Sequence, residues 1–252
     1  MTYPIKLDTL LIELADFCNL KCIMCDMSEE GRLRHGHPSP EQSIHGTQGR
    51  FLPFSSFRGI IDSINQSELK AGVISLFWLG EPMINSEIGK MLDYLSNHME
   101  NIDGWMLHTN GQILNEGTLR LMFESKGNNL LHFSVDAASP EVYGRVRRGG
   151  NYQILLENIR KALDLRREYP QSGLKLVLQF IVMEENKHEA RPFLDFWGNE
   201  FRKRGLKFSI ARNYSQHGQN TLFIRQEIAT PSLQAKANEM HQAVADATGV
   251  PK

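Results

Sequence analysis

The sequence has no cysteine outside one short stretch, residues 18–25, which holds all three of them as Cys18, Cys22 and Cys25. An odd number of closely spaced thiols makes a poor disulfide framework and indicates a metal-binding segment instead. The sequence also lacks a charge excess, since 28 basic residues stand against 29 acidic ones. It therefore offers no basic surface for a nucleic-acid backbone or an anionic membrane, and we expect it to bind neither.

Long apolar runs are absent too. None approaches the roughly 20 residues that a membrane-spanning helix needs. The first residues, Met-Thr-Tyr-Pro-Ile-Lys, contain no apolar signal core, so we expect a cytoplasmic protein. The 252 residues suit one large α/β or barrel domain with a short appendage.

Short apolar runs alternate with amphipathic stretches along the chain. Six runs predict strands, at residues 10–15, 73–78, 105–108, 130–135, 174–182 and 207–211. Apolar stripes at helical spacing occupy residues 88–99, 155–163 and 190–201, and Ser139-Pro140-Glu141 is typical of a helix start. Strands that alternate with helices predict right-handed βαβ units and a parallel sheet.

Two segments interrupt this alternation. Residues 28–50 are rich in Gly, Ser, Pro, Gln and His, and they predict a long loop inserted after the cysteines. Residues 213–252 form a C-terminal tail, which we expect to be irregular up to residue 230 and to hold one helix over residues 231–248. The predicted architecture is therefore α/β, a partial (β/α)6 parallel barrel over residues 1–212 with a helical tail.

The spacing of the cysteines leaves two kinds of metal centre open. Zinc would need a fourth ligand to complete its tetrahedron, which His35, His37 or His45 in the following loop could supply. A four-iron, four-sulfur cluster held by three thiolates keeps one iron open for another molecule. A zinc- or cluster-binding module without catalytic activity is therefore one hypothesis, and an enzyme that uses an open iron is the other.

Polar motifs follow the predicted strands. Leu79-Gly80-Glu81-Pro82 follows the second strand, His108-Thr109-Asn110-Gly111 ends the third, and Ser134-Val135-Asp136 ends the fourth. Ligands of parallel α/β proteins bind outside the carboxyl ends of the strands, so we expect these motifs to share one site with the cysteine loop after the first strand.

Together these residues resemble the radical S-adenosylmethionine (radical SAM) superfamily, whose signature Cys-x3-Cys-x2-Cys is matched by Cys18, Cys22 and Cys25. The resemblance covers residues 10–211 and implies a partial barrel of radical SAM type, with a [4Fe-4S] cluster and S-adenosylmethionine as cofactors. Residues 143–152 are similar to the Arg-x-Gly-Gly segment of a subgroup that often carries a C-terminal SPASM or twitch extension. Residues 213–252 contain no cysteine for an auxiliary cluster. Either the enzyme works with one cluster, or the chain stops before such a domain.

The resemblance also implies roles for single residues. Gly80, Glu81 and Pro82 would meet the methionine amino group, and Arg147, chosen over Arg145 and Arg148, would pair with the cofactor carboxylate. The charges suit these roles, since a carboxylate attracts an ammonium and a guanidinium forms paired hydrogen bonds with a carboxylate. The other predicted cofactor contacts are Thr109, Asn110, Ser134 and Asp136 for the ribose and the carboxylate, Met24 for the adenine, and Gln179.

The implied reaction is reductive cleavage of S-adenosylmethionine to a 5′-deoxyadenosyl radical, which abstracts a hydrogen atom from a substrate. The oxidoreductase and lyase classes both stay open, no catalytic residue is assigned, and the expected electron donor is of the flavodoxin or ferredoxin type. Gln179 near the end of the fifth predicted strand, and Arg212 with Asn213 at the end of the sixth, favour a small polar substrate, such as a sugar, an aminocyclitol or a similar metabolite. A radical SAM enzyme that modifies peptides is the alternative.

Overall fold

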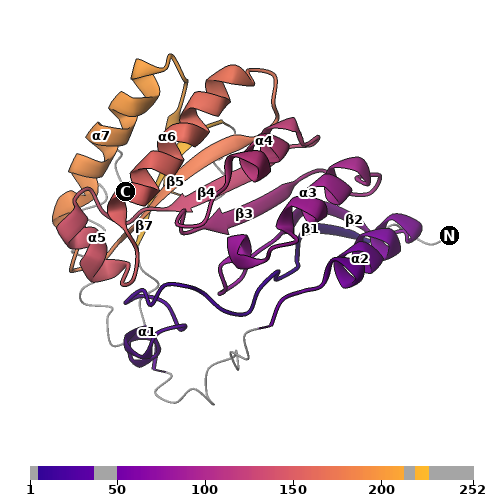
Figure 1. Cartoon of the computed structure of the whole chain (residues 1–252), viewed down its shortest axis with the longest axis horizontal. Helices are drawn as coiled ribbons and strands as arrows, with labels where there is room; N and C mark the ends of the chain where they lie inside the picture. The colour runs from indigo at the N-terminus through magenta and orange to yellow at the C-terminus, as the bar shows by residue number, and fades with distance from the viewer. Residues whose placement is uncertain (1–4, 37–49, 213–218, 227–252) are drawn as a thin grey trace.

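The computed structural model describes residues 5–36, 50–212 and 219–226. These residues form a seven-stranded sheet in the order β1-β2-β3-β4-β5-β7-β6, in which all neighbouring strands are parallel (Figure 1). The strands are β1 (Lys6–Leu11), β2 (Lys70–Ser75), β3 (Trp105–Thr109), β4 (Leu130–Ser134), β5 (Lys175–Val182), β6 (Ser209–Ala211) and β7 (Thr221–Gln226). The predicted α/β class and parallel sheet are confirmed, and the sheet is open, with β1 and β6 at its edges.

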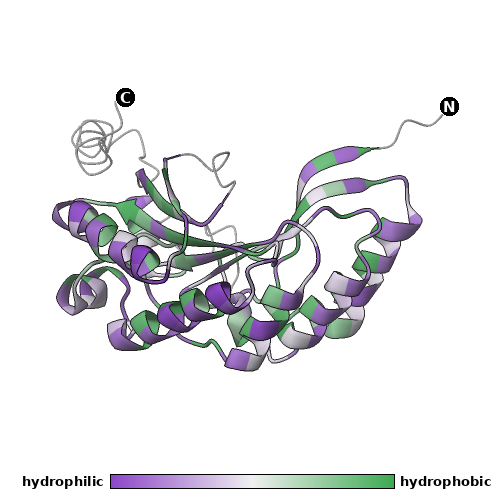
Figure 2. Ribbon diagram, turned by 90° about the horizontal axis from the view of Figure 1, so that it is seen from above, coloured by the Kyte–Doolittle hydropathy of each residue, from purple (hydrophilic) through white to green (hydrophobic). Residues whose placement is uncertain are grey.

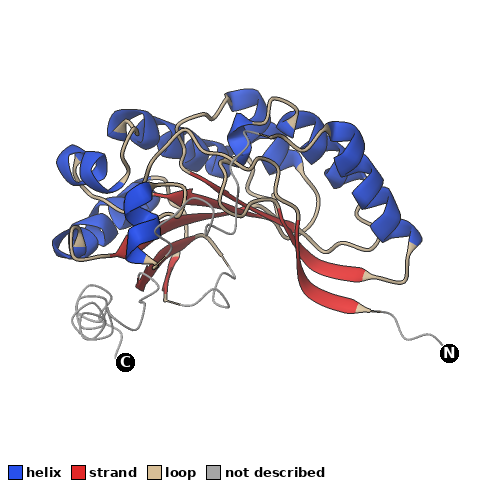
Figure 3. Ribbon diagram, turned by 90° about the horizontal axis from the view of Figure 1, so that it is seen from below, coloured by secondary structure: helices blue, strands red, loops and turns tan. Residues whose placement is uncertain are grey.

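Helices connect the strands. They are α1 (Glu29–Arg34), α2 (Phe54–Gln66), α3 (Ile88–Asn97), α4 (Glu116–Glu124), α5 (Pro140–Val146), α6 (Tyr152–Glu168) and α7 (Ala190–Lys203), with short 3-10 turns η1 (Pro82–Ile84) and η2 (Lys187–Glu189). The five helices α2, α3, α4, α6 and α7 lie along one face of the sheet (Figures 1 and 3). None of these five helices lies on the opposite face (Figure 3).

The hydrophobic core lies between the sheet and these helices. The strands are largely apolar along their central parts, whereas the helices alternate apolar and polar residues (Figure 2). Phe180 of β5 packs against Phe193 of α7 with ring centroids 5.1 Å apart, and both side chains are fully buried. Each such burial stabilises the fold by about 1.5–3 kcal/mol, so this layer holds the strand ends in place.

The first two strands begin and end earlier than the sequence predicts. The predicted windows, residues 10–15 and 73–78, include apolar side chains such as Leu14 and Leu76 that are fully buried but lie beyond the last strand residue. Both strands instead begin at polar residues, Lys6 and Lys70. Hydropathy reports burial, and here the buried segment continues past the strand into the loop that carries the site.

Residues 28–50 are not loop throughout, because α1 occupies part of them. The Ser28 hydroxyl accepts a hydrogen bond from the Gly31 amide at 2.9 Å and caps this helix. The remaining part of that predicted loop, residues 37–49, and the tail helix predicted over residues 231–248 lie outside the described residues. Helices α2 and α4 were not among the elements predicted from the sequence.

The prediction of an irregular segment after β6 is wrong for β7. Its apolar run Leu222-Phe223-Ile224 is short, and its partners lie on both sides, with Leu222 opposite Leu178 of β5 and Ile210 of β6. A strand inserted between two others depends on pairing that local periodicity does not report. In the described part of the chain, no helix is both long and apolar enough to cross a bilayer.

Candidate functional site

The cysteine loop follows β1 and is fastened to the segment after α5. The Ile23 amide donates to the Val146 carbonyl at 3.1 Å, and the Lys21 amide donates to the Arg148 carbonyl at 2.9 Å. The Ser28 hydroxyl donates to the Cys22 carbonyl at 2.7 Å. These bonds order the loop and bring Cys22 next to the residue between Val146 and Arg148, which is Arg147.

All three thiols are free, with Cys22 buried and Cys18 and Cys25 partly exposed. Burial raises the pKa of Cys18 to about 12 and that of Cys25 to about 11. Because a metal binds the thiolate, loading this loop must displace protons. Among the described residues, no three His, Cys, Asp or Glu side chains converge tightly enough to hold a single metal ion. A four-iron cluster binds its thiolates on different iron atoms, so its ligands stand farther apart than those of one ion.

Two side-chain nitrogens reach the cysteine sulfurs, in addition to the Leu20 amide, which donates to Cys18 Sγ at 3.4 Å. Arg147 Nη1 lies 3.4 Å from Cys22 Sγ, and the Asn110 side-chain amide lies 3.6 Å from Cys18 Sγ. The same amide donates to Asn19 Oδ1 at 2.8 Å, which fixes its orientation. Donors placed at sulfur stabilise the thiolate form and tune a bound iron–sulfur cluster, so this environment fits such a centre.

Gly80 and Glu81 lie in the loop after β2, in close contact with the loop after β1. A Cβ atom on Gly80 would stand 1.9 Å from the Ala15 carbonyl oxygen, so only glycine fits this crossing. The Glu81 amide donates to the Phe17 carbonyl at 2.9 Å, and the Glu13 carboxylate accepts from the Gly80 amide at 3.1 Å. The two loops thereby hold Glu81 beside the cysteine segment.

The Glu81 carboxyl is buried, with 3% of the residue exposed, and accepts three hydrogen bonds. Thr109 Oγ1 and the Met83 amide donate to Oε1 at 2.7 and 3.1 Å, and the Asn110 amide donates to Oε2 at 2.7 Å. Burial nonetheless raises the pKa of Glu81 to about 7, more than these donors lower it. A cation brought close to this carboxylate would stabilise its ionised form.

Asp136 follows β4 and holds Arg147. Its Oδ2 accepts hydrogen bonds from Arg147 Nε, at 2.7 Å, and from Arg147 Nη2. Its Oδ1 accepts from the Ile181 amide at 2.6 Å. The residue is fully buried at a φ of 57°, a conformation that aspartate tolerates better than most side chains, and Asn186 Nδ2 donates to its carbonyl at 2.8 Å. Both carboxylate oxygens of Asp136 thus accept hydrogen bonds from the protein, and its predicted contact with the ribose or the carboxylate of the cofactor stays a prediction.

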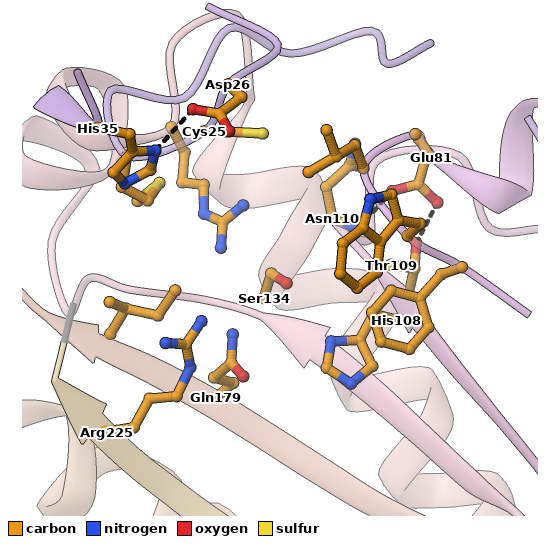
Figure 4. Close-up of a pocket in the computed structure, with 17 residues that line it drawn as sticks. Cys25, Asp26, His35, Glu81, His108, Thr109, Asn110, Ser134, Gln179 and Arg225 are labelled. Atoms are coloured by element: carbon orange, nitrogen blue, oxygen red, sulfur yellow. Dashed lines mark hydrogen bonds and ion pairs between the residues drawn. The ribbon is translucent and has the colours of Figure 1, made fainter. Parts of the chain in front are cut away.

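These elements surround a cavity of about 550 Å³ (Figure 4). Its volume lies within the range of small-molecule sites. The predicted residues that line it are Met24, Cys25, Gly80, Glu81, Thr109, Asn110, Ser134, Arg147 and Gln179. Cys18, Cys22, Pro82 and Asp136 are absent from its lining. Arg145 pairs with Glu141 on the surface and Arg148 pairs with Glu30, so of the three arginines considered Arg147 is the one in the cavity wall.

The cavity also contains residues that the sequence did not single out. Phe77, His108 and His132 stack in series, with ring centroids 3.8 and 4.0 Å apart, and the first two line the cavity. His108 stands one residue before Thr109, so its place at a strand end was visible in the sequence.

Three further lining residues carry ionisable side chains, and Trp78, Leu79 and Ile181 also line the cavity. Asp26 Oδ1 and His35 Nδ1 lie within hydrogen-bonding distance, 2.6 Å apart, beside Cys25, and the third residue is Arg225 of β7. Arg212, which we expected at the mouth, does not line the cavity, and Asn213, His37 and His45 lie outside the described residues.

A family model described as "Radical SAM superfamily" matches residues 12–196. A GTP 3′,8-cyclase of Desulforamulus reducens is 26% identical over 163 residues, which are 65% of this chain and 45% of that protein. A probable GTP 3′,8-cyclase of Methanocaldococcus jannaschii is 24% identical over 192 residues, 76% of this chain and 55% of that protein. The chain thus spans about half the length of the curated relatives it matches.

Solved structures share the fold. The structure titled anSMEcpe with bound AdoMet aligns with a TM-score of 0.54 at 16% identity, over 88% of this chain and 50% of that chain. HydG, a maturase of the [FeFe]-hydrogenase, aligns with a TM-score of 0.59 at 9% identity, over 97% of this chain and 50% of that chain.

Proposed function

The chain belongs to the radical SAM superfamily of enzymes, and we propose that it cleaves S-adenosylmethionine reductively and uses the resulting radical to abstract a hydrogen atom from a small polar substrate. The cofactors predicted from the sequence, a [4Fe-4S] cluster and S-adenosylmethionine, are those of this family. The observation that carries the proposal is the convergence of Cys25, Glu81 and Arg147 on one cavity.

Cys18, Cys22 and Cys25 would hold the cluster and leave one iron without a protein ligand. When bound together, the reduced cluster and S-adenosylmethionine supply a 5′-deoxyadenosyl radical. The chain's own part is to stabilise the thiolates, for which Arg147 at Cys22 and Asn110 at Cys18 stand in position.

Glu81 and Arg147 would hold the amino-acid end of the cofactor. The Glu81 carboxylate suits the ammonium, whose positive charge offsets the cost of keeping that carboxylate buried and ionised. The Arg147 guanidinium suits the carboxylate, and Asp136 fixes its plane through two hydrogen bonds. We therefore propose Asp136 as the residue that positions Arg147.

The rest of the cofactor would contact the side chains around Ser134. Ser134 and Asn110 line the cavity and carry groups that suit ribose hydroxyls, and Met24 offers a soft apolar surface to the adenine. Thr109 also lines the cavity, but its hydroxyl donates to Glu81 and accepts from the Gly111 amide, so its part is to hold Glu81. Gln179 of β5 also lines the cavity and is kept as a proposed contact of the cofactor.

GTP is the first substrate to test, because the curated relatives are named for it. This class differs from the free sugar or aminocyclitol expected from the sequence, although a nucleotide is also a small polar metabolite. The electron donor of the flavodoxin or ferredoxin type stays part of the proposal. Substrate modification is assayed separately from cofactor cleavage, since the two proposals can fail independently.

The test is anaerobic reconstitution of the full chain with iron and sulfide, followed by dithionite and S-adenosylmethionine. The proposal expects 5′-deoxyadenosine from the wild type and none from a variant with all three cysteines replaced by serine. A cluster-loaded sample that releases no 5′-deoxyadenosine, with or without GTP, contradicts it. Stoichiometric zinc in the purified protein, without absorbance near 400 nm, would favour the non-catalytic module instead.

A further inference from the structure

A second cavity, of about 430 Å³, lies at the opposite end of the sheet from the candidate site. β5 connects the two, since Lys175, its first residue, lines the second cavity and Ile181, near its end, lines the candidate site. Six residues of a strand span about 20 Å, so the two cavities are separate binding sites. We call the second one the basic pocket, and its cationic lining residues are Arg166, Arg167, Lys175, Arg204 and Lys207.

The cations of the basic pocket come from four separate segments. Arg166 and Arg167 lie in the last turn of α6, and Arg204 caps the end of α7. Lys175 begins β5, and Lys207 stands two residues before β6. Of the described residues that line the pocket, none carries a carboxylate. Because the chain as a whole is nearly neutral, this local excess of positive charge could not be seen in its composition.

The fold neutralises one of these five cations. Arg204 forms ion pairs with Asp164 at 2.6 Å and with Glu200 at 3.1 Å. The cations of the pocket that form no ion pair with any residue in the described part of the chain are Arg166, Arg167, Lys175 and Lys207. Two of these four, Arg167 and Lys207, are exposed, so the pocket is open to solvent.

Arg166 is the clearest case of a charge without a counter-charge. Its guanidinium is partly buried and donates to the carbonyls of Tyr169 and of Pro170, the latter at 3.2 Å. Burial lowers the pKa of Arg166, yet a guanidinium stays protonated in such surroundings. Cations held close together repel one another, so an anion that enters the pocket relieves a repulsion that the fold leaves in place.

The neutral polar side chains of the lining are engaged by the fold. The Asn220 side chain donates to the Lys207 carbonyl and accepts from the Leu176 amide, both at 3.1 Å. The Ser172 hydroxyl donates to the Phe123 carbonyl at 2.6 Å. A ligand in the pocket therefore meets mainly the charged side chains.

We propose that the basic pocket binds a small anion with two or more phosphate groups, such as pyrophosphate or the polyphosphate end of a nucleotide. One phosphate group carries a charge of about −1.5 to −2 near pH 7, so two of them balance the four cations that lack a carboxylate partner in the described structure. The arginines supply paired planar donors and the lysines compact charges. The inference does not depend on the proposed function, because the basic pocket and the candidate site share no described lining residue.

The probe is inorganic pyrophosphate, titrated by calorimetry into the cluster-reconstituted full chain at an ionic strength of about 0.15 M. Saturating S-adenosylmethionine is included to keep pyrophosphate out of the candidate site. We expect the wild type to bind pyrophosphate with a Kd below about 1 mM. Orthophosphate should bind about tenfold or more weakly, because it engages fewer of the cations.

Two variants locate the bound anion. The double variant Lys175→Gln/Lys207→Gln removes two charges and Lys207→Glu reverses one, and each should weaken pyrophosphate binding about tenfold or more. Lys207→Glu also serves if the double variant, which alters a strand residue, fails to fold. Circular dichroism and iron content would reveal such a failure.

Lys70→Glu is the matched control. Lys70 is exposed and begins β2, as Lys175 begins β5, and β3 and β4 lie between these two strands. Three strand spacings amount to about 14 Å, more than the Debye length of about 8 Å, so this variant should change the affinity by less than about twofold.

Four results would overturn the inference. The first is a wild type whose Kd for pyrophosphate exceeds about 1 mM, and the second is orthophosphate bound as tightly as pyrophosphate. The third is an effect of Lys207→Glu no larger than that of Lys70→Glu, which would place the anion elsewhere. The fourth is a hexaglutamate peptide that binds more tightly than pyrophosphate and is weakened by Lys207→Glu, which would assign the pocket to an acidic protein segment.

Discussion

Replacing Glu81 with glutamine changes both the pH dependence of stability and the binding of the cofactor. The rise of the Glu81 pKa from 4.5 to about 7 means that the folded protein without cofactor holds a proton that the unfolded chain releases. Stability is therefore highest below the unfolded value and falls as the pH rises through the interval from 4.5 to about 7. The shift corresponds to roughly 3 kcal/mol, lost by about pH 8.

Glutamine removes this titration. Its amide has one oxygen, which can keep the bonds from Thr109 and Met83, so its NH2 group then faces the Asn110 amide. That donor is left buried and unsatisfied, at a cost of about 1–3 kcal/mol. Near pH 5 the variant should thus be less stable than the wild type by about this amount, and near pH 8 the two should be about equal.

The assay is urea denaturation of the reduced protein without cluster, at several pH values between about 5 and 8, for the wild type and Glu81→Gln. Parallel pH profiles for the two proteins, or a wild type whose stability rises over this interval, would refute the reasoning. The cofactor gives a second readout. In the reconstituted protein at about pH 8, the variant should bind S-adenosylmethionine about tenfold or more weakly, because the ammonium loses a charge-assisted hydrogen bond.

Three further predictions concern single residues. Gly80→Ala should destabilise the protein by about 1–3 kcal/mol or more in urea denaturation, since its Cβ would meet the Ala15 carbonyl oxygen at 1.9 Å, and unchanged stability would contradict that crossing. Arg147→Lys should weaken S-adenosylmethionine binding about tenfold or more by calorimetry, whereas Arg145→Lys on the exposed surface should not, and equal effects would argue against the assignment. Cys25→Ser should lower the iron content and the absorbance near 400 nm of the reconstituted protein, and a fully loaded variant would remove Cys25 from the ligand set.

The meeting of the strand-end motifs could be predicted from the sequence. Glu81 follows β2, while Thr109 ends β3 and Asn110 follows it, and parallel neighbours place such residues at one edge. Their hydrogen bonds to Glu81 are the contacts that this rule anticipates. The burial of Glu81 could not be predicted from the sequence, because it depends on how the loop after β1 packs against this residue.

Asp136 illustrates a second limit. Its place after β4 predicted a side chain near the site, but its partners are Arg147, eleven residues onward, and the Ile181 amide of β5. Which carboxylate faces a ligand and which holds another side chain is decided by tertiary geometry. The type of residue alone suits both roles.

Arg225 illustrates a third. It lies on β7, whose place between β5 and β6 is set by pairing on both sides. Because the sequence did not predict this strand, it favoured Arg212, at the end of the predicted sixth strand, as the arginine of the site. The cavity contains Arg225 instead. Once the strand is in place, the two-residue alternation along it explains the choice.

The most direct measurement of the central claim is the electron paramagnetic resonance spectrum of the reconstituted, dithionite-reduced protein with and without S-adenosylmethionine. If three thiolates leave one iron open beside Glu81 and Arg147, addition of S-adenosylmethionine must change the cluster signal in the wild type, and the change must be weaker in Arg147→Lys at the same concentration. A cluster signal that is identical with and without S-adenosylmethionine in the wild type would contradict the claim.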